Sequence, residues 1–194
     1  LLGWLTRDGW TAGIARSLVC DANAAPSDAI LIENFDPNYL VFERATKLRR
    51  AGLATRVLVP VAAGPEATGT NAVALAVAEA MARIARLGEF DIVPIPEIEP
   101  ISLNAARDVL RYLEREGIRS VIVVSPLFRS RRSTLVYSAT LGVSGVAVTC
   151  EPVQGTRGVE TWSDSWHGLQ NVGEQWLKLQ YYRFYVLPFR SSQE

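Results

Sequence analysis

The chain is poor in the residue types that most often carry catalysis or bind metal. Among its 194 residues it has one histidine, His167, and two cysteines, Cys20 and Cys150. The cysteines are far apart, have no C-x-x-C spacing and have no neighbouring histidine, which argues against a metal site. We expect them to be two buried thiols, with a single disulfide as the alternative if the domain faces an oxidising compartment.

Long hydrophobic runs and an excess of charge of one sign are also missing. No stretch approaches the roughly 20 uninterrupted apolar residues that cross a bilayer. Twenty basic and 20 acidic residues give a net charge of zero, so we expect no nucleic-acid partner. There is no G-x-S-x-G nucleophile elbow. Asp164 or Ser165 is therefore interpreted as a helix cap and His167 as a surface or capping residue.

Five short and continuously apolar runs are present, as in buried parallel strands. Segments with helical spacing separate them, and this alternation predicts βαβ units and a mostly parallel sheet covered on both faces. The predicted strands are Asp28–Glu33, Arg56–Ala62, Phe90–Ile95, Ser120–Ser125 and Val146–Glu151. The predicted helices are Tyr39–Ala51, Ala72–Leu87, Ala105–Glu116 and Ser130–Leu141.

Each predicted helix is followed by a glycine, a residue that tolerates the left-handed conformation at a helix end. These glycines are Gly52, Gly88, Gly117 and Gly142. Ser102 is the expected N-cap of the third helix. The apolar stripe of that helix is predicted to belong to the core.

The two ends of the chain differ in character from the middle. Residues 1–24 begin with LLGWLTRDGW and are interpreted as a docking helix or as the segment that follows a signal or membrane anchor. Trp162–Phe189 is rich in aromatic residues and predicts a long helix. We expect it to pack over the sheet, with Leu169, Val172, Trp176, Leu179 and Tyr182 or Arg183 on one side. The alternative places its aromatic and basic face at a membrane or a partner.

Three arginines, Arg129, Arg131 and Arg132, follow the fourth predicted strand. Ligands of α/β proteins usually bind where parallel strands end, so we expect the arginines to meet an anion or a partner there, with a solvated helix start as the alternative. Glu33 and Asp36 follow the first strand. They are expected at the same rim, either to bind a sugar hydroxyl or to pair with the arginines.

In the order of these pieces the chain resembles the YdcF-like domain family, which includes the envelope proteins SanA and ElyC. The matching segments are SDAILIE, ERATKLRRAGLATRVLV, SLNAARDVLRYLEREGIRSVIVVSPLFRSRRSTLVYSATLG and EQWLKLQYYRFYVL. The resemblance implies a Rossmann-like three-layer α/β/α domain over residues 25–189, with a five-stranded sheet, a long C-terminal helix and a tail at 190–194. It also implies a bacterial protein on the periplasmic side of the cell envelope, associated with the membrane, and S-adenosylmethionine binding as in one branch of the family.

The positions that carry function in this family are kept only in part. Glu33 and Asn34 stand where the family usually has a Gly-Gly turn, and Arg129 stands at its usual histidine position. Ser102 and Asn104 remain before the third helix, and Ser125 remains after the fourth strand. The candidate ligand-binding residues are therefore Glu33, Asn34, Asp36, Ser102, Asn104, Ser125, Arg129, Arg131 and Arg132.

A guanidinium in place of an imidazole removes a general acid or base from that position. We therefore expect a binding or accessory subunit of a membrane-associated assembly, without family-type catalysis and with an anionic small molecule as possible ligand. The alternative is an enzyme, or a protein that binds S-adenosylmethionine or a nucleotide, acting on a phosphate- or lipid-linked sugar. In that case the arginines clamp the anion and Glu33 or Asp36 is the base.

Overall fold

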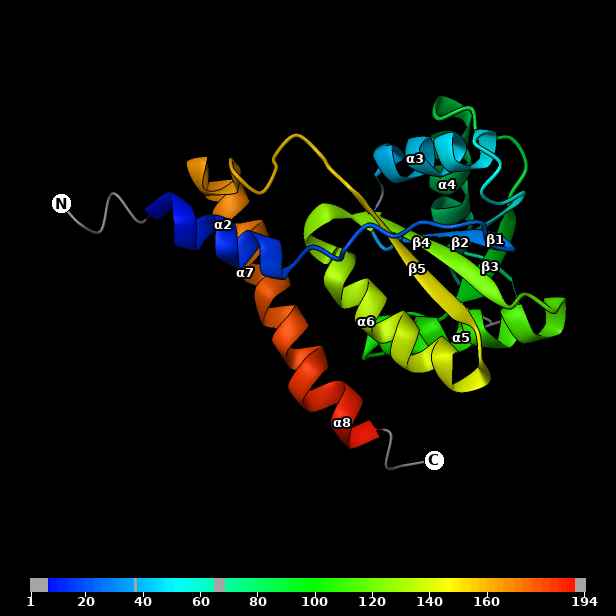
Figure 1. The fold of residues 1–194 in the computed structure, drawn as a ribbon. Coiled ribbons are helices and arrows are strands. Elements are labelled where there is room, and N and C mark those ends of the chain that lie inside the picture. Colours follow the sequence, from blue (N-terminus) through cyan, green and yellow to red (C-terminus); the bar gives the residue numbers. More distant parts are fainter. Residues whose placement is uncertain (1–6, 37, 65–68, 191–194) are drawn as a thin grey trace.

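The computed structural model describes residues 7–36, 38–64 and 69–190. Strands and helices alternate through the middle of the chain, as the apolar runs predict (Figure 1). In chain order the elements are α2 (Arg7–Ser17), β1 (Ala29–Ile32), α3 (Tyr39–Arg50), β2 (Arg56–Ala62), α4 (Ala72–Ile84), β3 (Asp91–Ile95), α5 (Ile101–Glu116), β4 (Ser120–Pro126), the 3-10 turn η1 (Leu127–Arg129), α6 (Ser130–Leu141), η2 (Gly142–Ser144), β5 (Ala147–Val153), η3 (Trp162–Asp164), α7 (Trp166–Tyr181), the π-helical segment η4 (Tyr182–Val186) and α8 (Leu187–Arg190).

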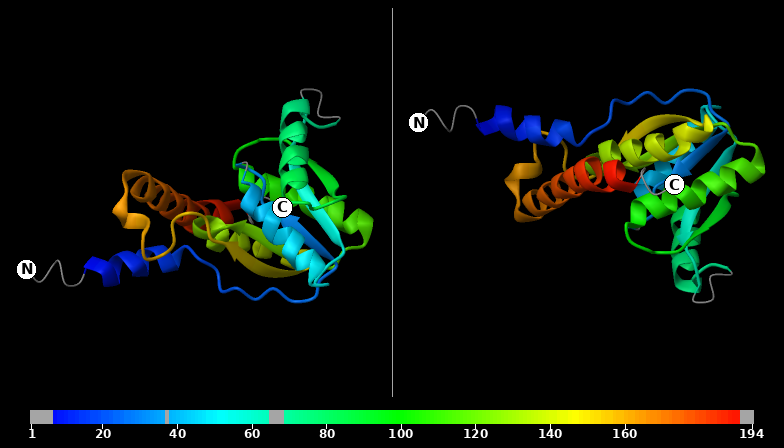
Figure 2. Two further views of the ribbon diagram at one scale, coloured as in Figure 1. Left: turned by 90° about the horizontal axis from the view of Figure 1, so that it is seen from above. Right: turned by 90° about the horizontal axis from the view of Figure 1, so that it is seen from below.

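The five strands form one parallel sheet in the order β3-β2-β1-β4-β5, which confirms the predicted Rossmann-like α/β class. Helices α3 and α4 cover one face of the sheet and α5 and α6 cover the other (Figures 1 and 2). In the central strands Ala29 and Leu31 pack toward α5 and α6, and Ile30 and Ile32 pack toward α3 and α4. Because both faces are buried, these strands are apolar throughout rather than alternating.

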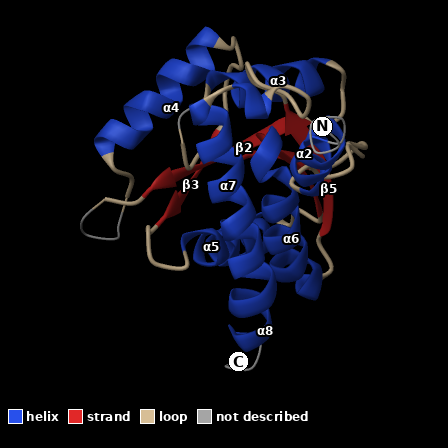
Figure 3. Ribbon diagram, turned by 90° about the vertical axis from the view of Figure 1, so that its left-hand side faces the viewer, coloured by secondary structure: helices blue, strands red, loops and turns tan. Residues whose placement is uncertain are grey.

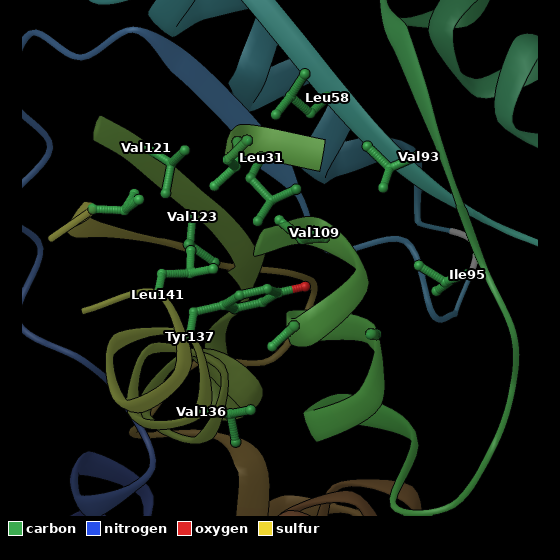
Figure 4. Packing of buried hydrophobic residues seen from close by; sticks show 14 of the residues in the cluster. Leu31, Leu58, Val93, Ile95, Val109, Val121, Val123, Val136, Tyr137 and Leu141 are labelled. Carbon is green, nitrogen blue, oxygen red and sulfur yellow. The ribbon is translucent and has the colours of Figure 1, made fainter. Parts of the chain in front are cut away.

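The core between the sheet, α5 and α6 includes one aromatic residue with a polar end. Tyr137 of α6 lies among Val123, Leu141 and other aliphatic side chains (Figure 4). Its side chain is 2% exposed, and its hydroxyl has no hydrogen-bond partner among the described residues. A buried hydroxyl usually has a hydrogen-bond partner. Tyr137 also lies close to Glu33 and Arg132, which belong to the site described below.

The structure corrects some of the predicted helix ends and caps. Helix α4 ends at Ile84 rather than at Leu87, and Arg86 already has a positive φ of 53°. Helix α5 begins at Ile101 rather than at Ala105, with Pro100 as its N-cap, so Ser102 lies in the first turn and does not cap it. Proline suits a helix start because its φ is fixed and it has no N–H to satisfy. Helix α6 has the predicted bounds, Ser130–Leu141, but Gly142 has φ −62° and begins the 3-10 turn η2; the left-handed residue is Gly145, at φ 74°. Gly117 ends α5 in the left-handed conformation, as predicted.

The long C-terminal helix runs from α7 through η4 to α8 and crosses the carboxyl ends of the strands (Figure 3). It begins at Trp166 with Ser165 as N-cap, as predicted for that residue. Helix α2 packs beside α7 in a separate small core that includes Leu18, Phe128 and Val172, and the Trp162 indole donates a hydrogen bond to Thr11 O at 3.1 Å (Figure 2).

Cys20 and Cys150 form a disulfide, so the expectation of two free thiols is wrong and the alternative is confirmed. The bond joins the segment after α2 to strand β5, and both residues are buried. Asn23 adds a second link, because its side chain accepts a hydrogen bond from the Cys150 N–H at 2.7 Å. The first part of the chain is thus tied to the edge of the sheet.

Candidate functional site

The sheet reverses its winding between β1 and β4. The chain continues from β1 to β2 on one side and from β4 to β5 on the other. The crevice outside the carboxyl ends of two such strands is the usual ligand site of doubly wound α/β folds. Here those ends are followed by Glu33 and by the turn η1.

A buried carboxylate lies at the floor of this crevice. Glu33 is 1% exposed, and its backbone N–H donates to Val124 O at 2.9 Å, which extends the pairing of β1 with β4. Its Oε2 accepts a hydrogen bond from Ser133 Oγ at 2.6 Å. Burial raises the pKa of Tyr137 strongly, the Glu33 carboxylate raises it further and Arg132 lowers it. Glu33 and Arg132 therefore lie close enough to Tyr137 to interact with it electrostatically.

Arg132 points into the crevice rather than to solvent, with 8% of its surface exposed. Its Nη1 donates to Ser102 Oγ at 3.1 Å, and its Nη2 donates to Gln175 Oε1 at 3.4 Å. The guanidinium carbon lies 5.6 Å from the ring centroid of Tyr182. The C-terminal helix therefore supplies two of the three groups that surround this charge.

Arg129 forms an ion pair with Asp36, so the rims after β4 and β1 meet as expected. The Arg129 side chain is 16% exposed, whereas that of Asp36 is 68% exposed. Burial lowers the pKa of the Arg129 guanidinium, the Glu33 carboxylate raises it, Arg132 lowers it and Glu174 raises it. Arginine nevertheless stays charged. A largely buried cation of this kind favours a nearby anion, and Asp36 supplies one.

Arg131 does not belong to this group, so the expectation of three arginines at one rim is wrong. Its backbone N–H donates to Leu18 O at 3.0 Å. Its guanidinium lies 3.8 Å from the carboxylate of Asp21, in the segment that follows α2. Residues three apart share a helix face, and neighbouring residues do not. Arg129 and Arg132 are three apart, and Arg131 therefore faces away.

The other predicted residues are also located. Asn34 Nδ2 donates to Pro60 O at 3.2 Å and so links the end of β1 to β2, whereas Asn104 Nδ2 donates to Ile98 O at 3.0 Å and holds the turn before α5. Ser125 is fully buried. Among the described residues, Ser125 Oγ, Asn34 Oδ1 and Arg132 Nε have no hydrogen-bond partner. Buried polar atoms without a hydrogen-bond partner are uncommon in folded proteins.

A cavity of about 150 Å³ opens beside this polar floor. Arg129 lies on one wall, the segment after β5 contributes Arg157, and α7 contributes His167 and Asn171. Asn38 at the start of α3 completes the polar lining. The cavity is lined by Asn38, Pro126, Leu127, Phe128, Arg129, Val153, Gly155, Thr156, Arg157, His167, Gly168 and Asn171.

The lining determines which chemical group the cavity suits. Two guanidinium groups and an imidazole line it, and the described lining residues include no carboxylate. Arginine binds phosphate and carboxylate through paired hydrogen bonds. Sites for drug-sized ligands measure about 300–1,000 Å³, so this cavity suits a phosphate-sized group rather than a whole nucleotide or S-adenosylmethionine. Within the described part of the chain, no group of three or more metal-ligating side chains is found.

Sequence reasoning missed several contributors, among them Arg157, His167 and Gln175. Arg157 lies in an irregular segment after β5 and carries no local signal. His167 was interpreted only as a surface or capping residue, and it is exposed, but it also lines the cavity. Gln175 is 2% exposed. Its spacing from Val172 and Leu179 places it on the packed stripe of α7, a signal that the sequence does contain.

Comparisons with known proteins found no matching family model, no matching curated protein and no matching solved structure.

Proposed function

We propose that this chain is a YdcF-like domain of the bacterial cell envelope, which binds a small anionic ligand at the end of β1 and β4 and acts as a binding or accessory subunit. The observation that carries the proposal is the cavity lined by Arg129, Arg157 and His167 at the switch point of the sheet. Ligand binding at this place is the rule in folds of this class. The ligand would present a phosphate or carboxylate group to the arginines.

Binding without family-type catalysis is supported by the places of the two candidate bases. Glu33 is buried behind the cavity and hydrogen-bonded to Ser133, and Asp36 is paired with Arg129. Neither residue lines the cavity. A general base must reach the proton that it removes, directly or through one water.

An envelope location is supported by the disulfide between Cys20 and Cys150. Disulfides form and persist in oxidising compartments such as the bacterial periplasm and are rare in the cytosol. No helix in the described ranges is long and apolar enough to cross a bilayer. Membrane association would therefore involve another part of the surface or another part of the protein.

A second candidate is an enzyme acting on a phosphate- or lipid-linked sugar, because His167 lines the same cavity as Arg129 and Arg157. Histidine is the most common general acid or base in enzymes. In this case His167 would transfer the proton while the arginines hold the anion. Turnover of a nucleotide sugar that is lost in His167→Ala would favour this candidate over simple binding.

The test is a titration of the full chain with inorganic phosphate, followed by calorimetry and by thermal unfolding. Arg157→Ala is the main variant because Arg157 is exposed and its loss does not disturb the core. Arg131→Ala is the matched control, since it removes the same charge from outside the crevice. We expect phosphate to raise the melting temperature of the wild type and of Arg131→Ala, and to bind Arg157→Ala about tenfold more weakly.

Two outcomes would contradict the proposal. One is an equal loss of phosphate affinity in both arginine variants, which would indicate general charge attraction. The other is the absence of any response to phosphate, to sugar phosphates, to nucleotide sugars and to S-adenosylmethionine. Stabilisation by S-adenosylmethionine alone would point to a site other than the small cavity.

A further inference from the structure

The C-terminal helix has two apolar sides that face in opposite directions. One side packs against the domain, through Val172, Leu179, Tyr182 and Val186, which are 1–5% exposed. A solvated surface helix is polar on its opposite side. Here the solvent-facing surface of the helix carries large apolar residues, which we call the aromatic face: Trp166, Leu169, Trp176, Leu177, Tyr181, Phe184, Tyr185 and Phe189. Leu177, Tyr181 and Phe184, at spacings of four and three, lie on the side opposite the packed residues, and Leu169 and Trp176 lie at its margin.

The aromatic face is too large to be an ordinary feature of a monomer surface. Its members are 42–72% exposed. Since a large aromatic side chain carries about 150–250 Å², the face exposes on the order of 900 Å². The largest apolar patch of a typical monomer is about 300–600 Å², and larger ones mark contact sites.

The rings of this face are ordered against one another. Tyr181 and Tyr185 stack with centroids 5.4 Å apart, and Tyr185 and Phe189 lie 5.9 Å apart. The helix from Trp166 to Arg190 is about 37 Å long at 1.5 Å per residue. The rings at the C-terminal end of the face therefore contact one another, and the helix that carries them lies on the outside of the domain (Figure 3).

The charges along this helix determine which occupant fits. It has three basic residues, Lys178, Arg183 and Arg190, and one acidic residue, Glu174, in a chain whose total charge is zero. The Glu174 carboxylate is bound by Lys178 Nζ at 2.5 Å. The helix sequence therefore carries more positive than negative charge, and an anionic lipid surface is complementary to it.

We propose that the aromatic face is a docking surface for an anionic phospholipid bilayer, with the C-terminal helix lying in the plane of the interface. Tryptophan and tyrosine concentrate where membrane and water meet, and helices with an apolar and a basic side lie in that zone. This inference deepens the proposed function and rests on its membrane association. It does not require the cavity to be occupied.

Docking in this orientation brings the cavity to the lipid headgroups. The same helix that carries the aromatic face lines the cavity with His167 and Asn171. A helix with its side chains is about 10–12 Å across, so the cavity lies within about that distance of the interface. The phosphate-bearing ligand of the cavity would then be part of a lipid headgroup.

The experiment measures sedimentation of the full chain with vesicles of phosphatidylglycerol and phosphatidylcholine, and with phosphatidylcholine alone. The variant Trp166→Gln/Leu177→Gln/Phe184→Gln removes part of the face at exposed positions. The control Val73→Gln/Ile98→Gln/Val143→Gln makes the same change at three apolar residues that are 60–87% exposed elsewhere. We expect the partition coefficient on anionic vesicles to fall about tenfold or more in the variant and to stay unchanged in the control.

Three results would overturn the inference. The wild type fails to bind anionic vesicles, or the variant and the control bind equally, or the wild type is a dimer that the variant dissociates. Phosphate titration separates failure of the docking inference from failure of the proposed function. A variant that binds phosphate but not vesicles has lost only docking, and Arg157→Ala is expected to lose phosphate affinity while it still sediments with vesicles.

Discussion

The guanidinium of Arg132 lies over the ring of Tyr182, 5.6 Å from its centroid, and so joins the start of α6 to the C-terminal helix. The Tyr182 hydroxyl also accepts a hydrogen bond from the Ser102 N–H at 3.0 Å, in the first turn of α5. One side chain of η4 thus satisfies a free donor at a helix start and shields a buried charge. The C-terminal helix is therefore part of the crevice as well as its cover.

We expect Tyr182→Phe to lower the free energy of unfolding by about 1–2 kcal/mol, because the partly buried Ser102 N–H loses its acceptor. Urea denaturation followed by circular dichroism measures this. Tyr185→Phe is the control, since Tyr185 is 62% exposed, and it is expected to change stability by less than about 0.5 kcal/mol. Equal effects of the two substitutions would contradict the role given to the Tyr182 hydroxyl.

Replacement of Glu33 by glutamine should destabilise the fold by about 1–3 kcal/mol. The buried carboxylate accepts a hydrogen bond from Ser133 and lies near Arg129, so its loss weakens that hydrogen bond and removes one of the negative charges near Arg129, which keeps Asp36 as its ion-pair partner. Glu116→Gln breaks an exposed ion pair with Arg56 and is expected to cost less than about 1 kcal/mol. A stable Glu33→Gln protein would show that the crevice does not depend on this charge.

Reduction of the disulfide should lower the free energy of unfolding by about 2–4 kcal/mol, because the bond closes a long loop between residues 130 positions apart. Scanning calorimetry with and without a phosphine reductant tests this. The double variant Cys20→Ser/Cys150→Ser should match the reduced wild type and should not respond to the reductant. A wild type whose melting temperature ignores the reductant would contradict it.

Gly168 in the first turn of α7 leaves no room for a side chain, since a Cβ there would overlap the carbonyl group of Trp162. We expect Gly168→Ala to destabilise the protein by about 1–3 kcal/mol or more. Gly173→Ala is the control on the same helix, because no atom lies within 4 Å of its added Cβ, and it should stabilise by up to about 1 kcal/mol. Thermal unfolding of the two variants should therefore shift in opposite directions.

Much of the fold was predictable because its signals are local. The continuous apolar runs at Ala29–Ile32 and Ser120–Pro126 identify strands buried on both faces, and Gly117 ends helix α5 as predicted. The C-terminal helix was only half predicted. Val172 and Leu179 pack as expected, but Leu169 and Trp176 are more than 40% exposed, because the packed stripe is narrow and leaves them on the other side.

The sequence by itself determined the alternation of strands and helices, since each element depends on the spacing of apolar residues within a few turns or one strand. Only the tertiary structure decided that Arg129 and Arg132 enter the crevice while Arg131 does not, that His167 and Arg157 meet at one cavity, and that Cys20 bonds to Cys150. These relations join residues that are distant in the chain. Their geometry depends on how the helices pack around the sheet, which no local pattern specifies.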